Sequence, residues 1–449
     1  MGELFGTDGI RGEVGVYPIT SEVAVGVGRA LAVALQHQGQ SAPQVVIGRD
    51  TRESGEMLES GLTEGLTEVG ADVLLAGVVP TPAVAFLTKA MTADAGVVLT
   101  ASHNPYTDNG IKIFDQDGLK LSDDLEDHIE QLVMDPPTEI ADARARHGSI
   151  RDVGNGEAQY VDFVTKTLAG RKINGLHIVL DCANGATHRI APIIFGELGA
   201  EVTTLCNRPD GRNINRDCGA LHPEAAAKVV IENGADAGIS FDGDGDRVIF
   251  SDAKGNVVDG DRILLMCALD MCERGILKDN TLVVTTMSNL GLHSAAEEKD
   301  ISVEVTDVGD RHVSERMREN GYNLGGEKSG HIIFLDHAST GDGIVTALQV
   351  LGLMKQSRKK LRTLAACMEE YPQKLVGIPV HDKPPLEELP EFSKVLRKCE
   401  KKLGADGRVI ARYSGTEEKL RILVESKDPD AVEYWVDKLS EAARKEIGQ

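Results

Sequence analysis

Aromatic side chains are scarce in this sequence, and its cysteines lack the spacings typical of disulfide or metal sites. Phe, Trp and Tyr make up 4% of the 449 residues, whereas glycine occurs 48 times. This composition favours a loop-rich α/β protein over a coiled coil or a disordered tail. The seven cysteines are scattered, odd in number and without a C-x-x-C pair. We therefore expect reduced thiols rather than a disulfide framework or a zinc site.

Basic residues are too few to balance the acidic ones, and no long apolar run is present. Lys and Arg number 48 against 71 Asp and Glu, which gives a formal net charge of −23. Such a charge disfavours nucleic acid as a partner, although local arginines can still bind a small anion. The most apolar stretch, residues 71–87, contains Asp72 and two prolines and is too short to span a membrane. The N-terminus lacks the basic and apolar regions of a signal peptide, so we expect a soluble cytoplasmic protein.

Short Val/Ile/Leu runs alternate with helix-length segments in three similar cycles. Each cycle predicts a strand, a glycine-bearing turn, a helix, a second strand and, after a further helix, a distinctive polar loop. The cycles start at residues 44–50, 177–186 and 281–291, and their loops read "TASHNP" (100–105), "GISFDGDGDR" (238–247) and "YNLGGEKSGH" (322–331). The pattern indicates three related α/β modules with mostly parallel sheets. Each module would present one polar loop at an equivalent strand end, where sites form in such sheets.

Loop-rich stretches divide the chain into four expected domains. The first linker region is 134–156, and the last is the proline-rich stretch 371–391. Beyond it, a smaller module should contain a strand, a helix, a strand–loop–strand unit at 407–425 and a helix at 429–446. The predicted domains are residues 1–152, 153–255, 256–370 and 371–449.

The "DGDGDR" segment is the most informative short stretch. Its glycines let the backbone fold so that Asp242, Asp244 and Asp246 converge, and an oxygen-rich anionic site suits Mg²⁺, Mn²⁺ or Ca²⁺. An EF-hand is excluded because Arg247 and Ala253 stand where that loop needs Gly and Glu. An Asp-x-Asp after an apolar strand also fits an aspartyl-phosphate enzyme with Asp242 as the nucleophile, and this alternative stays open.

The "TASHNP" loop places Ser102 beside His103 without a Gly-x-Ser-x-Gly elbow. Lys112 is close enough in sequence to return to the same loop. A serine–histidine pair alone is more often structural than catalytic. This pair becomes a candidate for catalysis only because its loop occupies the same place in its module as the "DGDGDR" loop does in the second.

In "GEKSGH", Glu327, Ser329 and His331 occupy alternate positions. On a strand-like loop these side chains would point the same way and suit a hydroxyl-rich ligand such as a sugar.

The segment "RYSGTEEKLR" has the residue types of a phosphate-binding loop. Hydroxyls, backbone N–H groups freed by glycine and guanidinium groups together bind phosphate oxygens. The candidates are Arg412, Ser414, Gly415, Thr416 and Arg421.

Three more arginines lie in N-terminal loops. Arg11 follows a glycine-rich turn in "GTDGIRG", whereas we expect Arg49 and Arg52 to form structural ion pairs.

These segments, taken in order, resemble the α-D-phosphohexomutase superfamily over essentially the whole chain. The motifs that carry the resemblance are "FGTDGIRG", "GRDTRESG", "TASHNPYTDNGIK", "NINRDCGALHPE", "SFDGDGDR", "GEKSGH" and "RYSGTEEKLR". The resemblance implies four domains around a central cleft: three related α/β modules and a C-terminal α+β phosphate-binding domain.

The resemblance also implies a role for each candidate residue. Ser102 would carry a phosphoryl group and, as phosphoserine, would join Asp242, Asp244 and Asp246 in holding one Mg²⁺ per subunit. The residues around the transferring phosphoryl group would be Arg11, His103, Lys112 and Arg247. Glu327, Ser329 and His331 would contact the sugar. The distal phosphate would be bound by Arg412, Ser414, Gly415 and Thr416.

The implied reaction interconverts glucosamine 6-phosphate and glucosamine 1-phosphate through a hexosamine 1,6-bisphosphate, and it would supply the synthesis of UDP-N-acetylglucosamine and cell-wall precursors. The resemblance also implies a homodimer.

Lys328 and Tyr413 differ from the residues common in the family, so a mannose or glucose phosphomutase is the alternative. Either His103 or Lys112 could take the sugar hydroxyl proton, and a non-catalytic phosphosugar-binding protein is the remaining alternative.

Overall fold

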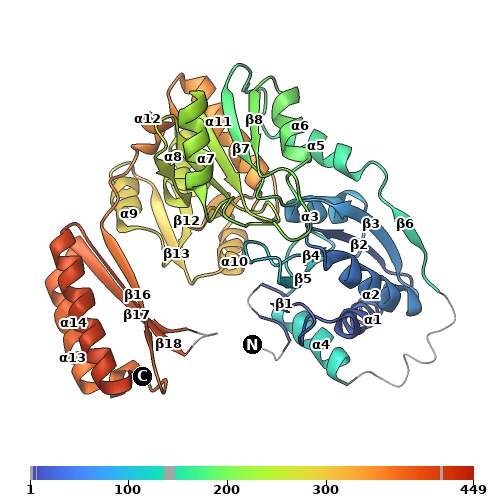
Figure 1. Cartoon of the computed structure of the whole chain (residues 1–449), viewed down its shortest axis with the longest axis horizontal. Helices are drawn as coiled ribbons and strands as arrows, with labels where there is room; N and C mark the ends of the chain where they lie inside the picture. Colours follow the sequence, from blue (N-terminus) through green and yellow to red (C-terminus); the bar gives the residue numbers. More distant parts are fainter. Residues whose placement is uncertain (1–3, 7, 136–146, 415–417, 449) are drawn as a thin grey trace. The chain divides into compact units, whose positions relative to one another are not determined.

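The computed structural model of the chain describes residues 4–6, 8–135, 147–414 and 418–448. The chain divides into two compact units. Unit 1 comprises Met1–Met287 and Lys299–Cys367, and unit 2 comprises Ser288–Glu298 and Met368–Gln449. Helices alternate with the strands of four sheets, so the predicted multidomain α/β class is confirmed (Figure 1).

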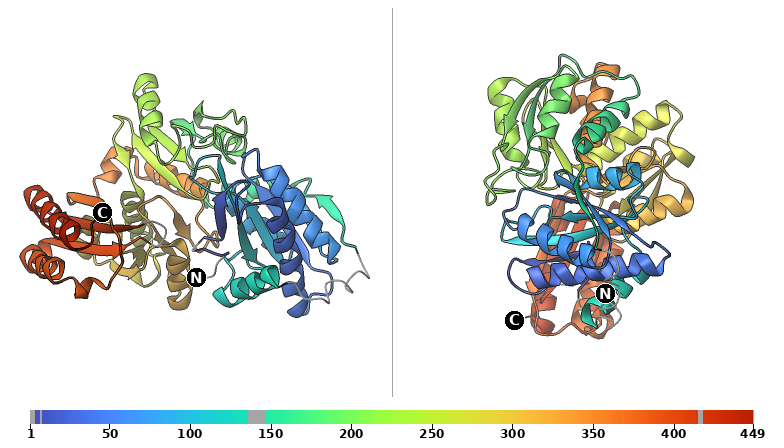
Figure 2. Two further views of the ribbon diagram at one scale, coloured as in Figure 1. Left: turned by 60° about the horizontal axis from the view of Figure 1, so that its bottom comes forward. Right: turned by 90° about the vertical axis from the view of Figure 1, so that its right-hand side faces the viewer.

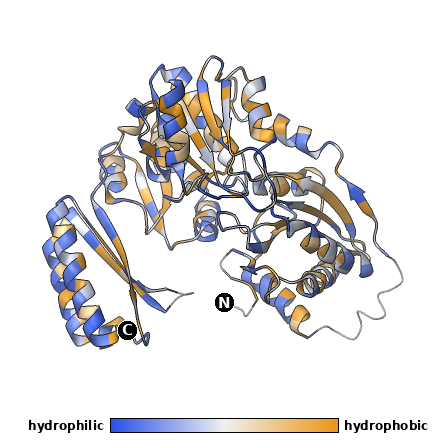
Figure 3. Ribbon diagram, in the orientation of Figure 1, coloured by the Kyte–Doolittle hydropathy of each residue, from blue (hydrophilic) through white to orange (hydrophobic). Residues whose placement is uncertain are grey.

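The first sheet has the strand order β1-β5-β4-β2-β3-β6, with β1 and β5 antiparallel to their neighbours. Its strands are β1 (Ile10–Glu13), β2 (Gln44–Arg49), β3 (Asp72–Val78), β4 (Ala95–Leu99), β5 (Asp108–Asp115) and β6 (Ile150–Asp152). Its helices are α1 (Ser21–His37), α2 (Gly55–Glu68), α3 (Thr81–Ala90) and α4 (Asp123–Met134). Most strand residues of this sheet are coloured as hydrophobic in Figure 3. Alternation along buried strands sends half of these side chains to each face of the sheet.

Helices α1 and α2 lie side by side against this sheet (Figure 2). α1 begins after Thr20, whose hydroxyl accepts the N–H of Val23. The two helices can approach closely because Gly65 of α2 has no side chain. A Cβ at this position would lie 2.1 Å from the Val25 carbonyl of α1. Leu31 and Leu62 from these helices join strand residues such as Ile47 in one buried core.

The second sheet has the order β11-β10-β9-β7-β8, and the third has the order β13-β12-β14-β15. The strands of the second sheet are β7 (His177–Asp181), β8 (Glu201–Leu205), β9 (Ala237–Phe241), β10 (Val248–Asp252) and β11 (Val257–Val258). Those of the third are β12 (Thr281–Thr285), β13 (Ser302–Thr306), β14 (Leu324–Gly326) and β15 (Ile332–Phe334). The helices of this part of the chain are α5 (Gly156–Lys166), α6 (Ile190–Glu197), α7 (Pro223–Asn233), α8 (Gly260–Glu273), α9 (Leu290–Glu297), α10 (Asp310–Asn320), α11 (Gly343–Ser357) and α12 (Leu361–Ala365).

The three sheets share one four-strand pattern. The orders β5-β4-β2-β3, β10-β9-β7-β8 and β15-β14-β12-β13 are equivalent, with the first strand of each antiparallel and the other three parallel. The predicted threefold repeat of topology is therefore confirmed. Each polar loop singled out above joins the antiparallel pair of its sheet, so the three loops occupy equivalent places.

Part of the region that we predicted to be a linker is a strand. Residues Ile150–Asp152 form β6, which pairs in parallel with β3. The Val73 N–H donates to the Ser149 carbonyl over 2.8 Å, and the Gly148 N–H donates to Thr67 over 2.8 Å. This short strand forms because the open edge of β3 offers backbone partners, which sequence composition does not reveal.

Unit 2 contains an antiparallel sheet of order β16-β18-β17 with two helices packed on it. Besides α9, this unit contains β16 (Gln373–Pro379), α13 (Pro390–Leu403), β17 (Gly407–Tyr413), β18 (Lys419–Ser426) and α14 (Pro429–Ile447). Phe392 and Trp435 from the helices meet Ile422 and Val424 from the sheet in a separate core. The predicted order of elements in the smaller module is confirmed.

Candidate active site

The "TASHNP" loop and the "DGDGDR" loop meet directly. The Ser102 hydroxyl donates to Asp242 over 2.7 Å. The Thr81 N–H donates to the Asp244 carbonyl over 2.9 Å, and the Thr81 hydroxyl donates to the Asp244 carboxylate over 2.7 Å. Residues that are about 140 positions apart in sequence thus form one site, as their equivalent strand ends had suggested.

Ser102 is held in an unusual backbone conformation. Its φ is +50°, in the left-handed region that non-glycine residues seldom adopt, and its side chain is buried. Its N–H donates to the Thr100 hydroxyl over 2.9 Å. Its carbonyl accepts hydrogen bonds from Arg52 (3.0 Å) and Asn215 (2.8 Å). Strained residues persist where their surroundings fix them, which is common at active sites.

The Arg52 side chain holds the backbone of the "TASHNP" loop through several hydrogen bonds. Its guanidinium is fully buried, pairs with Asp50 at 2.8 Å and donates to the carbonyls of Ser102, Asn104, Pro105 and Asp108. The structural ion pair predicted for Arg52 is therefore confirmed.

Arg49 forms its own pairs, with Glu56 at 3.2 Å and Glu59 at 3.4 Å, as predicted.

Asp242, Asp244 and Asp246 converge as expected. Each offers an oxygen, and these oxygens lie within 4.8 Å of one another in a fully buried group. Both glycines of the motif are required: a Cβ on Gly243 would lie 2.6 Å from the Ser102 carbonyl, and Gly245 has a φ of +73°. Burial, then Asp246 and Asp244, raise the pKa of Asp242.

The donor set fits a hard divalent cation. Asp244 Oδ1 and Asp246 Oδ1 are buried and have no hydrogen-bond partner among the described residues. Unpaired buried carboxylate oxygens are costly, and a Mg²⁺-type ion binds such oxygens.

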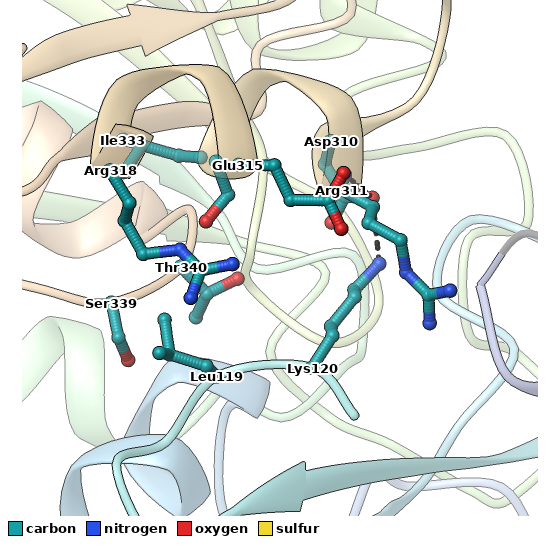
Figure 4. A pocket seen from close by; sticks show the side chains of 10 residues that line it. Leu119, Lys120, Asp310, Arg311, Glu315, Arg318, Ile333, Ser339 and Thr340 are labelled. Carbon is teal, nitrogen blue, oxygen red and sulfur yellow. Dashed lines mark hydrogen bonds and ion pairs between the residues drawn. The ribbon is translucent and has the colours of Figure 1, made fainter. Parts of the chain in front are cut away.

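The buried carboxylates belong to a closed ring of polar contacts that spans all three α/β modules, in which the links through His331 are ionic only when its imidazole is protonated. The members in order are Lys112, Asp8, Lys120, Asp310, His331 and Asp246, which returns to Lys112. Figure 4 shows Lys120 reaching Asp310 of α10, at an Nζ–Oδ1 distance of 2.6 Å. Burial alone would raise the pKa of Asp8, but Lys112, Lys120 and Arg11 together hold it well below its usual range.

His103, Arg11 and Arg247 lie around the same cluster. The Ser102 hydroxyl and His103 Nδ1 are 3.3 Å apart. Burial, with the charges of Arg247 and Arg11, lowers the pKa of His103 to about 4, so its imidazole is neutral at pH 7. Arg11 pairs with Asp8 at 2.8 Å. The backbone N–H of Arg247 donates to the Asp242 carboxylate over 3.1 Å, and the Nε atom of its side chain lies 3.8 Å from Asp246 Oδ1.

The "GEKSGH" segment is a tight hairpin, and our strand-like expectation was wrong. The Glu327 N–H donates to the His331 carbonyl over 2.9 Å, and the Gly330 N–H donates to Glu327 over 3.0 Å. Ser329 is exposed at the tip, whereas the His331 ring is buried and its Nε2 accepts the Gly341 N–H over 3.1 Å. Residues facing each other across a turn do not follow the alternation of a strand.

The phosphate-binding candidates of unit 2 lie on β17 and β18. Arg412 and Arg421 are direct partners in the antiparallel register, so their side chains leave the same face of the sheet. Ser414 is buried, its N–H donates to Lys419 over 2.9 Å, and its carbonyl accepts from Lys383 over 3.2 Å. The candidates Gly415 and Thr416 lie outside the described residues.

Several residues of the site were missed by the sequence analysis, among them Thr81, which bonds to Asp244. Asp8 lies in "GTDGIRG" and Asn215 in "NINRDCGALHPE", so both were within segments already singled out. Asp310 and Lys120 lie in no such segment, because only the packing of α10 against the first module brings them together.

The fold and the site define a multidomain α/β protein whose strand-end loops join a buried serine to an acidic cation-type site. Family models describe the same chain as phosphoglucomutase/phosphomannomutase: alpha/beta/alpha domain I matches residues 2–138, domain II 158–255, domain III 259–371 and the C-terminal domain 375–442. The chain belongs to the phosphoglucomutase/phosphomannomutase family.

Full-length relatives carry a more specific name. Phosphoglucosamine mutase of Citrifermentans bemidjiense is 48% identical over 100% of this chain and 99% of its own. Phosphoglucosamine mutase of Syntrophus aciditrophicus is 46% identical over the full length of both chains.

Solved structures share the fold. A phosphoglucomutase/phosphomannomutase family protein from Burkholderia thailandensis aligns with a TM-score of 0.82 at 25% identity, covering 99% of each chain. N-acetylphosphoglucosamine mutase of Aspergillus fumigatus, solved with GlcNAc-6P and magnesium, aligns with a TM-score of 0.69 at 18% identity, covering 99% of this chain and 96% of its own.

Among the described residues, no helix combines the length and the apolar character that crossing a membrane requires.

Proposed function

We propose that this protein is a phosphoglucosamine mutase, which interconverts glucosamine 6-phosphate and glucosamine 1-phosphate through a 1,6-bisphosphate. The observation that carries the proposal is the 2.7 Å contact between the Ser102 hydroxyl and the acidic cluster at Asp242. The 48% identity to phosphoglucosamine mutase over the whole chain supports the choice of sugar. The product would supply the synthesis of UDP-N-acetylglucosamine and cell-wall precursors.

Ser102 is the proposed carrier of the phosphoryl group. Its fixed, left-handed backbone would aim the esterified oxygen at the substrate, and Arg52 and Asn215 would keep the loop in place during both half reactions. Asp242, Asp244 and Asp246, with the phosphoserine, are the proposed ligands of one Mg²⁺. A bound Mg²⁺ would neutralise charge on the transferring phosphoryl group, whose reaction depends mainly on position and charge.

The remaining residues of the cluster would move a proton and balance charge. Arg247 and Arg11 would face the phosphoryl oxygens. A base must take the proton of the attacking sugar hydroxyl, and His103 and Lys112 are the two proposed candidates. His103 is 3.3 Å from the Ser102 hydroxyl, and Lys112 contacts Asp244 at 3.1 Å.

The sugar and its far phosphate would be bound by the other two loops. We propose that Glu327 and Ser329 at the hairpin tip contact the sugar, with His331 holding the hairpin from its buried side. For the distal phosphate we propose Arg412, Ser414, Gly415, Thr416 and Arg421. The two arginines are direct partners in the register of β17 and β18, so both guanidinium groups would be available to one phosphate on that face of the sheet.

Other expectations stay proposals of the same kind. We retain the division into domains 1–152, 153–255, 256–370 and 371–449, the cytoplasm as the compartment, and a homodimer as the assembly. The hexosamine 1,6-bisphosphate is proposed both as the intermediate and as an activator.

The decisive experiment replaces the carrier. Ser102→Ala should lower mutase turnover by at least roughly 10³-fold with bisphosphate supplied, because the group that accepts the phosphoryl is gone. Intact-mass measurement of active protein should show one phosphate on the peptide that contains Ser102. Full activity in a folded Ser102→Ala protein would refute the proposal. A phosphoenzyme that carries no phosphate on Ser102 and is lost in Asp242→Asn would favour the aspartyl-phosphate alternative.

The choice of sugar needs a separate measurement. We expect the highest kcat/KM with glucosamine 6-phosphate among the glucosamine, glucose and mannose phosphates. A preference for mannose or glucose phosphate would instead support a phosphomannomutase/phosphoglucomutase. Binding of sugar phosphates without any isomerised product in NMR would identify a binding protein.

A further inference from the structure

Two cysteines meet beside Asp181 at the strand ends of the second sheet. Asp181 ends β7 and is paired in register with Leu205, the last residue of β8, and Cys206 follows directly. The Asp181 carboxylate also accepts the Gly219 N–H over 2.7 Å, which brings in Cys218 from the next loop. The two sulfurs and a carboxylate oxygen lie within 4.8 Å of one another.

The two thiols already interact. Their sulfurs lie within 4.8 Å of each other, and this proximity is the main cause that lowers the pKa of Cys206 and raises the pKa of Cys218. Cys206 is half-buried, whereas Cys218 is buried. A thiolate is the reactive form of cysteine, so the thiol that ionises more readily is also the one that solvent reaches.

We propose that Cys206 and Cys218 form a modification site, at which a peroxide converts the two thiols into a reversible intramolecular disulfide. The Cys206 thiolate attacks one peroxide oxygen, which gives a sulfenic acid and releases the other oxygen as water. The Cys218 sulfur then attacks the sulfenic sulfur, the S–S bond forms and a second water leaves. Two thiols lose two electrons and two protons in total, and one hydrogen peroxide is reduced to two waters.

The neighbouring groups favour a disulfide over a metal site. Both oxygens of Asp181 already accept backbone N–H groups, from Ala183 at 3.0 Å and from Gly219 at 2.7 Å. A cation would have to share the carboxylate with these bonds, whereas a disulfide needs only the two sulfurs. Cys182 also lies nearby, but burial raises its pKa, which keeps it a thiol.

The disulfide would close the base of the loop 207–217, which reaches the candidate active site. Asn215 of this loop donates to the Ser102 carbonyl over 2.8 Å and to the Asn104 carbonyl over 3.1 Å. The Gly211 carbonyl accepts the Glu53 N–H over 3.0 Å. Oxidation would therefore act on the segment that fixes the Ser102 loop.

The test uses the full chain. The protein is treated with hydrogen peroxide, free thiols are alkylated, and tryptic peptides are analysed without reduction. We expect the peptides 190–212 and 217–228, which carry Cys206 and Cys218, to appear joined, with two of the seven thiols lost and both restored by dithiothreitol. Cys206→Ser and Cys218→Ser should each abolish the joined peptide. Cys272→Ser is the matched control, because this half-buried thiol donates to Asn280 rather than to sulfur, and the joined peptide should persist.

Several results on the wild-type protein alone would overturn the proposal. These are sulfinic acid on Cys206 without a joined peptide, a Cys182–Cys206 disulfide, a disulfide between two chains, or no reaction of either thiol. Reaction of the two thiols only after a chelator has removed bound zinc would identify a metal site instead.

Discussion

At the scale of single residues, Lys112 balances the charge of the buried carboxylates. Its Nζ lies 3.1 Å from Asp244, 3.2 Å from Asp8 and 3.4 Å from Asp246. Burial lowers the pKa of Lys112, but these three carboxylates outweigh burial and hold it well above its usual value. Lys112 is therefore an ammonium at neutral pH, which leaves His103 as the proposed base, and it supplies part of the positive charge that a divalent ion would bring.

Replacing Lys112 by methionine should separate turnover from cation binding. We expect mutase turnover to fall at least about 100-fold, because the reacting phosphoryl group loses a preorganised cation. Mn²⁺ binding, measured by calorimetry, should be unchanged or tighter, since a competing positive charge is gone. Lys120→Met is the control: Lys120 pairs with Asp8 and Asp310, which lie outside the Asp242–Asp244–Asp246 cluster, so its loss should affect turnover less. Weaker Mn²⁺ binding in Lys112→Met would contradict this account.

We expect the buried Arg52–Asp50 ion pair to contribute to folding stability rather than to the reaction itself. Removing one partner of a buried ion pair leaves the other charge uncompensated, so Arg52→Met should lower the free energy of unfolding by about 3–5 kcal/mol. Urea denaturation followed by far-UV circular dichroism measures the change. Arg29→Met serves as the comparison, since the Arg29–Glu68 pair is about 40% exposed and should contribute at most about 1 kcal/mol. Similar losses in the two variants would argue against a special role for Arg52.

At the scale of elements, α11 begins with a cap that is buried close to the site. The Asp342 carboxylate accepts the N–H groups of Ile344 and Val345, both at 2.9 Å, and the Tyr160 hydroxyl at 2.8 Å. Burial nevertheless raises the pKa of Asp342 from 3.8 to about 6. The cap thus ionises within an accessible pH range.

This cap should make stability depend on pH. The folded protein binds the Asp342 proton more tightly than the unfolded chain, so the contribution of Asp342 to stability falls as pH rises from 3.8 to about 6 and is constant above. Asp342→Asn removes the titration. The free energy of unfolding of the variant relative to wild type should therefore rise by on the order of 2 kcal/mol across that range.

The measurement is urea denaturation at a series of pH values. Asp428→Asn is the matched control, because Asp428 caps α14 at an exposed position. A difference for Asp342→Asn that does not change with pH would contradict the prediction.

At the scale of the whole molecule, the unfolding of the two compact units can be followed by different signals. The single tryptophan of the chain, Trp435, is buried in the core of unit 2. The acidic cluster lies in unit 1. Tryptophan fluorescence therefore reports the unfolding of unit 2, and far-UV circular dichroism reports both units.

Mg²⁺ should stabilise unit 1 selectively. At a concentration 100 times its Kd, a ligand that binds only the folded state contributes about 3 kcal/mol. We expect Mg²⁺ to raise the midpoint of the main circular dichroism transition and to leave the Trp435 transition unchanged. In Asp244→Asn the Mg²⁺ effect should shrink or vanish. An equal shift of both transitions in the wild type would show that the units unfold together.

Most of the elements, the threefold repeat and the residue types of the site follow from local residue patterns. Alternating apolar runs specify strands locally, and the glycines of "DGDGDR" show where carboxylates converge. Ser102, Asp242, Asp244 and Asp246 could therefore be named in advance.

Packing between elements sets which of these side chains meet and how they are charged. The ring through Asp8, Lys120 and Asp310 joins residues more than 100 positions apart. The hairpin that buries His331 and the contact of Cys206 with Cys218 join nearer residues, but they depend on how loops fold over the sheets. Their pairing depends on how helices and loops pack over the sheets, and burial together with neighbouring charges then sets which groups are ionised at neutral pH. Local sequence patterns contain neither distances nor burial, and for this reason they could not predict those contacts.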